Sequence, residues 1–307
     1  MSVPLTRRTL LALAALPVAG APRPKGLLID THIHLFARDR RRWPIHPDGP
    51  YDPGVQDLED YRAFVAESGV DHAVIVHPEP YQDDHSYLEH CFDHEPSPGF
   101  FKGTCLLDPL LDETPARLAA LKMKLGGRLV ALRIHAMNAP GEPPLASGPI
   151  KNRNLRDPRM KRAWKAASDL GMAIQMHFLP HHAPEIGALA AEFRDTPIIL
   201  DHLARAGMGT PGDYRNVLKL ADAPNIYMKF SGVRYSSKRE YPYDDAKPTV
   251  QQAYHAFGPE RMIWGGLGYN MADFEQSARL LDRMFDFASE SDRVSIRGLT
   301  AKKLFGF

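Results

Sequence analysis

The stretch Leu27-Leu28-Ile29-Asp30-Thr31-His32-Ile33-His34 is an apolar run that ends in imidazole side chains. Short apolar or β-branched runs bounded by turn residues predict buried strands. Seven similar runs follow along the chain, and four of them also end in histidine. The predicted strands are Leu27–His32, Val70–His77, Phe100–Leu107, Leu129–His135, Met172–His177, Ile198–His202, Asn225–Phe230 and Arg261–Trp264.

Helical patterns separate these runs and are bounded by Gly, Pro, Asp or Ser. Strict alternation of strands and helices implies parallel pairing through right-handed crossovers. Eight such units favour a closed (β/α)₈ barrel, the TIM-barrel fold, in a single domain over residues 22–307. An open doubly wound sheet is the alternative. The predicted helices are Asp57–Ser68, Glu113–Leu125, Pro158–Leu170, Ala183–Phe193, Tyr214–Ala221, Thr249–Phe257, Asp273–Ala288 and Val294–Leu304.

The composition is that of an ordinary globular protein, with 307 residues, 44% hydrophobic and 24% charged. The net charge of +1 creates no field that would attract nucleic acid or an anionic membrane, so we expect a small-molecule substrate. No GxGxxG or GxxxxGK[ST] motif supports nucleotide binding. Two cysteines, Cys91 and Cys105, are too few for a disulfide framework, and the sequence leaves their pairing open.

Residues 1–21 have the pattern of an export signal of the twin-arginine type. Arg7 and Arg8 precede an apolar stretch from Leu10 to Val18, and small residues follow at 19–21. The apolar stretch is about half the roughly 20 residues that a membrane-spanning helix needs. We therefore expect cleavage near Pro22, a periplasmic mature protein and no membrane association after cleavage. A permanent anchor is the alternative.

Six of the 14 histidines lie at or just past the end of a predicted strand. In a barrel of parallel strands, these ends open onto one face, so the side chains are expected to converge. Converging imidazoles can bind zinc, manganese or iron. These histidines are His32, His34, His77, His135, His177 and His202.

The HxH pair on the first strand is the sharpest metal signal. Because side chains alternate along a strand, Asp30, His32 and His34 are expected on one face. His177 and His202 each end an apolar run, as ligands on the fifth and sixth strands should. Alternatively, these rings are hydrogen-bonded polar groups of the core.

Four further residues are candidates for substrate contacts. Arg133 and His135 share one face of the fourth strand, where they could bind a carboxylate or polarise a carbonyl, and Lys229 could contact an anion at the end of the seventh. Ion pairs within the barrel are the alternative for both cations. His77, at the end of the second strand, either binds substrate or supports residues that do.

Six segments along the chain form a recognisable series: DTHIHLF at 30–36, GMAIQMH at 171–177, LDHLAR at 200–205, NIYMKFSGV at 225–233, FGPERMIWG at 257–265 and AKKLFGF at 301–307. Together they resemble the amidohydrolase-related family of metal-dependent hydrolases, in family order from one end of the mature chain to the other. The resemblance is to the lactonase branch, which contains 2-pyrone-4,6-dicarboxylate lactonase and fuconolactonase; a second branch contains decarboxylases.

The resemblance implies that His32, His34 and His177 bind one divalent metal, zinc or manganese, and that His202 contacts the metal or the substrate. The family's eighth strand carries WGSDxP, whose Asp is a metal ligand and the general base. Here Leu267 or Gly268 stands in that place, so the Asp is missing. His202, or less directly Asp273 or Asp30, could replace it. Alternatively, a metal held by neutral histidines activates water alone, or catalysis has been lost.

The sequence thus predicts a periplasmic hydrolase that acts on a small lactone or ester-like substrate. A substrate that carries a carboxylate is one form of this prediction. His202 would orient the water or the carbonyl, and Arg133 and Lys229 would bind a carboxylate or the developing oxyanion. His135 and His77 would contact the substrate. A non-catalytic binding barrel and a metal-dependent decarboxylase are the alternatives. A homo-oligomer is compatible with the sequence, which marks no interface.

Overall fold

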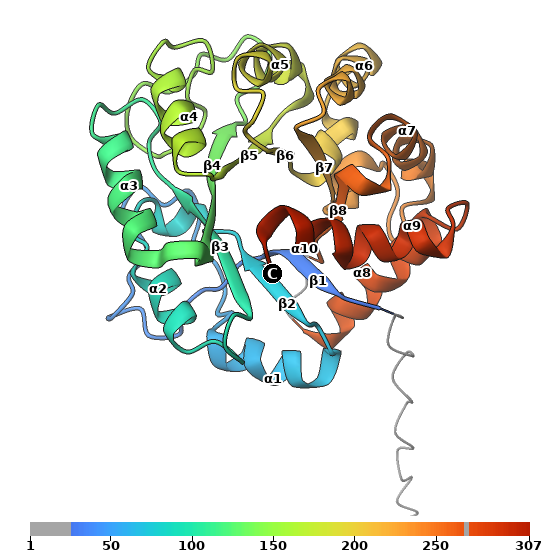
Figure 1. Cartoon of the computed structure of the whole chain (residues 1–307), viewed down its shortest axis with the longest axis horizontal. Coiled ribbons are helices and arrows are strands. Elements are labelled where there is room, and N and C mark those ends of the chain that lie inside the picture. Colours follow the sequence, from blue (N-terminus) through green and yellow to red (C-terminus); the bar gives the residue numbers. More distant parts are fainter. Residues whose placement is uncertain (1–25, 267–269) are drawn as a thin grey trace, which may run out of the picture.

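A computed structural model describes residues 26–266 and 270–307. Within these ranges, eight parallel strands form one sheet in sequence order, surrounded by helices (Figure 1). The predicted TIM barrel is therefore confirmed. The strands are β1 Ile29–Ile33, β2 His72–Ile75, β3 Phe101–Leu106, β4 Leu129–Ala136, β5 Ala173–Phe178, β6 Ile198–Leu200, β7 Ile226–Phe230 and β8 Met262–Trp264.

Side chains of β1 and β7 link the first strand to β8 and β7 and so close the barrel. Thr31 Oγ1 donates a hydrogen bond to the Trp264 carbonyl at 2.6 Å, and Lys229 Nζ donates to the Thr31 carbonyl at 3.0 Å. The sheet register also matters for the site, since His135 on β4 pairs directly with His177 on β5.

The helices pack around the sheet and begin and end near the predicted positions. Two differences stand out: α2 was not predicted, and the expected helix Val294–Leu304 is divided by a π-turn at Ser295–Leu299 into α9 and α10. The helices are α1 Leu58–Ser68, α2 Ser86–Asp93, α3 Thr114–Leu125, α4 Met160–Asp169, α5 Ala183–Glu192, α6 Pro211–Lys219, α7 Lys247–Phe257, α8 Met271–Met284, α9 Glu290–Val294 and α10 Thr300–Phe305.

Two hydrophobic clusters form the core, and neither closes the end of the barrel at which the strands finish. The larger lies between sheet and helices. The smaller joins residues near the starts of strands, such as Ile29, Val74 and Ile199, to Ala301 and Phe305 of α10. In Figure 1, α10 lies across the barrel. Because α10 covers the end where strands begin, the end where strands finish is left for the site.

Cys91 and Cys105 are both buried free thiols. No helix in residues 26–266 and 270–307 is long and apolar enough to cross a membrane. The predicted leader at 1–21 lies outside the described residues.

Candidate functional site at the carboxyl ends of the strands

Histidines from four strand ends gather at one end of the barrel. The ring centroids of His32 and His34 are 5.0 Å apart, and those of His32 and His202 are 4.6 Å apart. His177 lies 5.6 Å from His202 and 4.9 Å from His135. The structure thus brings together rings that are up to 170 positions apart in sequence, as the strand-end placement predicts.

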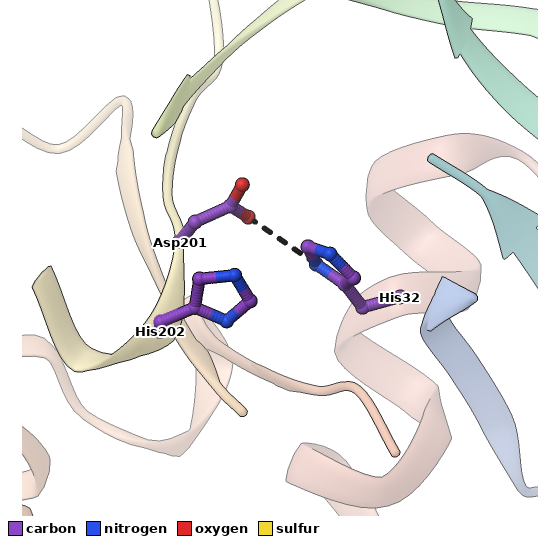
Figure 2. Close-up of side chains that lie close together, drawn as sticks. All are labelled: His32, Asp201 and His202. Carbon is purple, nitrogen blue, oxygen red and sulfur yellow. Dashed lines mark ion pairs between the residues drawn. The ribbon is translucent and has the colours of Figure 1, made fainter. Parts of the chain in front are cut away.

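Asp201 is the charge centre of this cluster, and the sequence analysis missed it. Its carboxylate is 3.1 Å from Lys229 Nζ and 3.1 Å from Arg133 Nη2, and it accepts from Gln175 Nε2 at 3.1 Å. Oδ1 also lies 3.6 Å from His32 Nδ1, and Figure 2 shows the carboxylate facing that ring beside His202. Burial raises the pKa of Asp201, but Lys229 and Arg133 outweigh it and hold the pKa well below its usual range. Asp201 is therefore ionised.

Lys229 and Arg133 therefore form buried ion pairs with Asp201. Both side chains are buried, and both charges face Asp201. Burial lowers the pKa of Lys229, and Asp201 opposes that shift. Both residues form ion pairs within the barrel, as the alternative interpretation describes.

His32 and His34 present a donor pair that fits a divalent cation. Their Nε2 atoms are 3.4 Å apart, and His34 Nδ1 lies 2.7 Å from the Val76 carbonyl. Because Nδ1 must carry the proton to donate there, Nε2 of His34 offers a lone pair. Zn–N bonds of about 2.0–2.1 Å at a tetrahedral angle place two ligand nitrogens roughly 3.3–3.4 Å apart. The spacing and the chemistry of this pair therefore fit zinc.

His177, the third predicted ligand, has other partners. Its Nε2 lies 3.1 Å from Nε and 2.5 Å from Nη2 of Arg205, and its Nδ1 is 3.1 Å from His135 Nδ1. Among the described residues, the groups of three whose ligand atoms lie within 4.8 Å of one another are His32, Asp201 and His202, and Glu79, His135 and His177. The structure therefore does not place His177 in one such group with His32 and His34.

Arg205 is a second residue that the sequence analysis missed. It is buried, and its guanidinium lies 3.8 Å from the centroid of the Tyr235 ring. Within the described part of the chain, it has no carboxylate at ion-pair distance. Burial lowers the pKa of Arg205, and the neighbouring Tyr235 opposes that shift.

The turn that carries His202 and Arg205 has an unusual backbone. His202, Leu203, Ala204 and Arg205 all have left-handed φ values between 51° and 58°. Non-glycine residues in such conformations cost of order 1–3 kcal/mol each and cluster at functional sites. The fold thus stabilises a strained turn that points an imidazole and a guanidinium into one site.

His135 and His77, the predicted substrate contacts, differ in position. His135 Nδ1 lies 2.7 Å from Glu79 Oε1, an acid that the sequence analysis also missed. Burial raises the pKa of Glu79, but His135 and Arg133 outweigh it and bring the pKa down to about 2. His77 Nε2 lies 2.9 Å from the Gln82 carbonyl, and its ring packs 4.4 Å from His85. These contacts tie His77 to the segment after β2.

The end of β8 packs tightly against β1. Gly266 N donates to Asp30 Oδ1 at 2.7 Å, and a Cβ on Gly266 would lie 2.5 Å from Asp30 Oδ2. Burial raises the pKa of Asp30 to about 6, against the opposing hydrogen bonds from His32 and Gly266. Leu267 and Gly268, which stand where the family has its Asp, lie outside the described residues. Asp273 accepts from Asn270 Nδ2 at the start of α8.

A cavity of about 210 Å³ opens beside this cluster, between the ends of β7 and β8 and helix α8. Its wall is made of polar and apolar groups in similar measure, and one of the polar residues, Ser231, is hydrogen-bonded to Nδ1 of His202 at 2.8 Å. The lining includes Ser231, Arg234, Tyr241, Tyr243, Gly266, Asp273, Gln276 and Ser277. The cavity can therefore hold a small polar molecule next to the imidazoles.

Residues 29–307 match the sequence profile of the family described as Amidohydrolase. The chain belongs to this family. It is 28% identical over 245 residues to a 4-sulfomuconolactone hydrolase of Rhizobium radiobacter, covering 79% of this chain and 75% of that one. The predicted resemblance to the lactonase branch and the predicted hydrolase are confirmed at this level.

Solved structures share the amidohydrolase fold. One is a probable 2-pyrone-4,6-dicarboxylic acid hydrolase of Acinetobacter baumannii with citric acid bound, with a TM-score of 0.72, 18% identity and coverage of 91% of this chain and 99% of that one. Another is an amidohydrolase of Burkholderia multivorans with bound zinc, with a TM-score of 0.68, 16% identity and coverage of 92% and 100%. At these identities, the likeness shows the fold alone.

Proposed function

We propose that this amidohydrolase hydrolyses a small lactone that carries an acidic group. Arg205 is the observation that carries the proposal, because a buried guanidinium without a carboxylate partner in the described residues is best compensated by an anion from the substrate. The names of the relatives support the reaction: one hydrolyses 4-sulfomuconolactone, and a structural neighbour is named for a dicarboxylic acid. Both names combine a lactone or pyrone ring with an acid group.

We further propose that one divalent metal takes part. His32 and His34 would hold it through Nε2, with His202 or Asp201 as the next nearest donors. The family resemblance implies His177 as a further ligand. His177 would bind the metal only if Arg205 no longer donated to Nε2 of His177. When bound, such a metal polarises a carbonyl oxygen and lowers the pKa of a coordinated water to about 7.

The remaining groups divide the work of binding and proton transfer. Arg205 would anchor the acidic group, and its contact with the Tyr235 ring holds the guanidinium in place. His202 would accept a proton during the reaction, because its ring is neutral. Burial lowers the pKa of His202 well below the usual value, although Asp201 opposes that shift. Asp201 would orient His32 through Nδ1, with Lys229 and Arg133 keeping Asp201 ionised.

A lactone panel with a pH indicator tests this function. Carboxylated and sulfonated lactones are expected to be hydrolysed with higher kcat/KM than neutral lactones of the same ring size. Metal content is measured on the same preparation. Bound metal without turnover of any lactone would favour a binding protein, and release of carbon dioxide in place of net acid would favour a decarboxylase.

We also propose export to the periplasm through the leader at 1–21, which rests on Arg7-Arg8 and the apolar stretch after them. Expression in a bacterium with and without a functional twin-arginine system tests it. The mature protein should begin near Pro22 and reach the periplasm in the first strain alone. Retention of the uncleaved chain in the cytoplasm of both strains would contradict export.

A further inference from the structure

We infer that the cavity beside the histidine cluster binds hydroxyl groups, so that the substrate is the lactone of a hydroxylated sugar acid. This inference rests on the proposed hydrolysis of an acidic lactone and names the class of that lactone. Asp273, Gln276 and Ser277 line the cavity of about 210 Å³, and we call them the α8 subsite. Because Gln276 and Ser277 follow Asp273 by three and four positions, all three residues share one face of α8.

The side chains of the α8 subsite have hydrogen-bonding groups that the protein itself does not use. Asp273 Oδ2 accepts from Asn270 Nδ2 at 2.9 Å, and Oδ1 has no hydrogen bond to the described residues. The side chains of Gln276 and Ser277 make no hydrogen bond within residues 26–266 and 270–307. Glu275 on the same helix, in contrast, is ion-paired with an arginine at 2.7 Å. The groups of the α8 subsite can therefore bond to a ligand without breaking an ion pair.

The charges that line the cavity favour neutral polar groups on the ligand. The carboxylate of Asp273 accepts hydrogen bonds, and the guanidinium of Arg234, which lines the same cavity, donates them. An acidic group placed here would be repelled by Asp273, and an ammonium group would be repelled by Arg234. A hydroxyl group carries no charge and both donates and accepts. Hydroxyl groups therefore match both ends of this wall, and the acidic group of the substrate is left for Arg205.

The remaining wall suits the carbon skeleton of a sugar acid. Tyr241 and Tyr243 form a T-shaped pair with ring centroids 5.9 Å apart, and Phe230 and Leu280 add apolar surface. Tyrosine has an apolar ring and a polar hydroxyl, as a sugar has C–H groups beside its hydroxyls. The volume is below the roughly 300–1,000 Å³ of pockets for drug-sized ligands. The cavity therefore fits a single small ring with short substituents.

The cavity also extends to the histidine cluster, since Ser231 and Gly265 line its wall. Ser231 Oγ is 2.8 Å from His202 Nδ1. A Cβ at Gly265 would lie 2.7 Å from His32 Cβ. A lactone whose hydroxyl groups contact α8 would thus have its carbonyl group near these imidazoles. A lactone without hydroxyl groups would displace water from Asp273 and offer no donor in return, and sites built to bind a hydroxyl discriminate strongly against such analogues.

Two linear diacids test the α8 subsite by binding alone. D-glucarate and adipate have the same chain length and charge, and only D-glucarate carries hydroxyl groups. Isothermal titration calorimetry of the mature protein should give a Kd for D-glucarate that is at least about tenfold lower than that for adipate. Equal affinities, tighter binding of adipate or no binding of either acid would overturn the inference.

Variants of α8 show whether these side chains cause the preference. D273N exchanges a charged acceptor for a neutral amide, and Q276L removes a donor and an acceptor. In each variant the ratio of the two affinities should fall at least about threefold. E275Q is the matched control, because it removes a carboxylate of α8 outside the cavity, and it should keep the wild-type ratio. If D273N fails to fold, Q276L decides, and an unchanged ratio in the folded variants would overturn the inference.

A kinetic comparison separates this inference from the proposed function. The γ-lactone of D-glucaric acid should be hydrolysed with higher kcat/KM than γ-carboxy-γ-butyrolactone, which has the same ring size and an acidic group but no hydroxyl groups. Equal or faster turnover of the second lactone would leave the proposed function standing and overturn the sugar-acid class. Tighter binding of D-glucarate than of adipate without turnover of any lactone would support the α8 subsite and end the proposed hydrolysis.

Discussion

The guanidinium of Arg205 occupies Nε2 of His177, with Nη2 at 2.5 Å and Nε at 3.1 Å. His177, which the family resemblance assigns to a metal, therefore accepts hydrogen bonds from a cation through this nitrogen. A guanidinium and a divalent ion cannot share one lone pair, and their charges repel strongly at this distance in a buried site. His177 can therefore bind a metal only when Arg205 moves away from its Nε2 atom.

Replacing Arg205 with alanine should therefore strengthen zinc binding. R205A frees Nε2 of His177 and removes one positive charge, so we expect zinc affinity to rise about tenfold or more. Zinc titration with a competing chelator measures the change. R205K keeps a positive charge without the two parallel N–H groups and should fall between R205A and the wild type. Equal affinity in all three proteins would show that His177 takes no part in metal binding.

Asp201 should be the most important single carboxylate for stability. D201N leaves Lys229 and Arg133 buried without a counter-charge, and loss of one partner of a buried ion pair costs about 3–5 kcal/mol. Urea unfolding measures the loss, and D195N, at an exposed position, is the control. The double variant D201N/K229M should recover part of the stability, because it removes one of the two uncompensated charges.

A D201N protein as stable as D195N would contradict the assignment of Asp201 as the charge centre. So would a double variant that is less stable than D201N, because the two losses would then be independent.

The sequence predicted the barrel because its signals are local. Apolar runs such as Met172–His177 and Ile198–His202 mark strands by their length and composition, and the histidines at their ends fix the face on which they meet. The closed cylinder then follows from strict alternation. Strand boundaries agree to within about three residues for the same reason, as β5 at Ala173–Phe178 illustrates.

The residues missed at the site depend on geometry that a sequence does not signal. Arg205 reaches His177 because four consecutive residues are left-handed, yet Leu203 and Ala204 are residues that rarely adopt this conformation. Asp201 was overlooked beside His202, although an acid at the end of an apolar run is itself a signal of a buried ion pair. Glu79 contacts His135 only through the turn that follows β2.

Gly265 should be needed for the position of His32. A Cβ at Gly265 would lie 2.7 Å from His32 Cβ and 3.2 Å from its backbone nitrogen, so G265A must displace the first strand. Overpacking of this kind costs about 1–3 kcal/mol, and metal affinity should fall with it because His32 moves. G127A is the control, since a Cβ there meets nothing within 4 Å. Thermal unfolding and zinc titration of both variants measure the two effects, and a G265A protein that matches G127A in both would contradict the packing argument.

Burial of His85 should lower the free energy of unfolding at acid pH. Its Nε2 accepts from the Leu106 amide at 3.2 Å, and burial, helped by Arg117, lowers its pKa to about 3. In the unfolded chain the ordinary pKa is about 6.5, so between pH 6.5 and 3 the unfolded state binds a proton that the folded state does not. The contribution of this group is therefore fully present above pH 6.5 and is lost at up to about 1.4 kcal/mol per pH unit below it.

The variant H85Q keeps an acceptor for the Leu106 amide but cannot take up a proton. Its free energy of unfolding, measured in urea between pH 7 and pH 4.5, should therefore fall less steeply than that of the wild type, by about 1.4 kcal/mol per pH unit at the low end. H255Q, which removes an exposed imidazole, is the control for loss of a histidine. Parallel curves for H85Q and the wild type would mean that His85 is protonated in the folded protein, and the hydrogen bond from Leu106 to its ring would have to be abandoned, because a protonated imidazole has no lone pair to accept it.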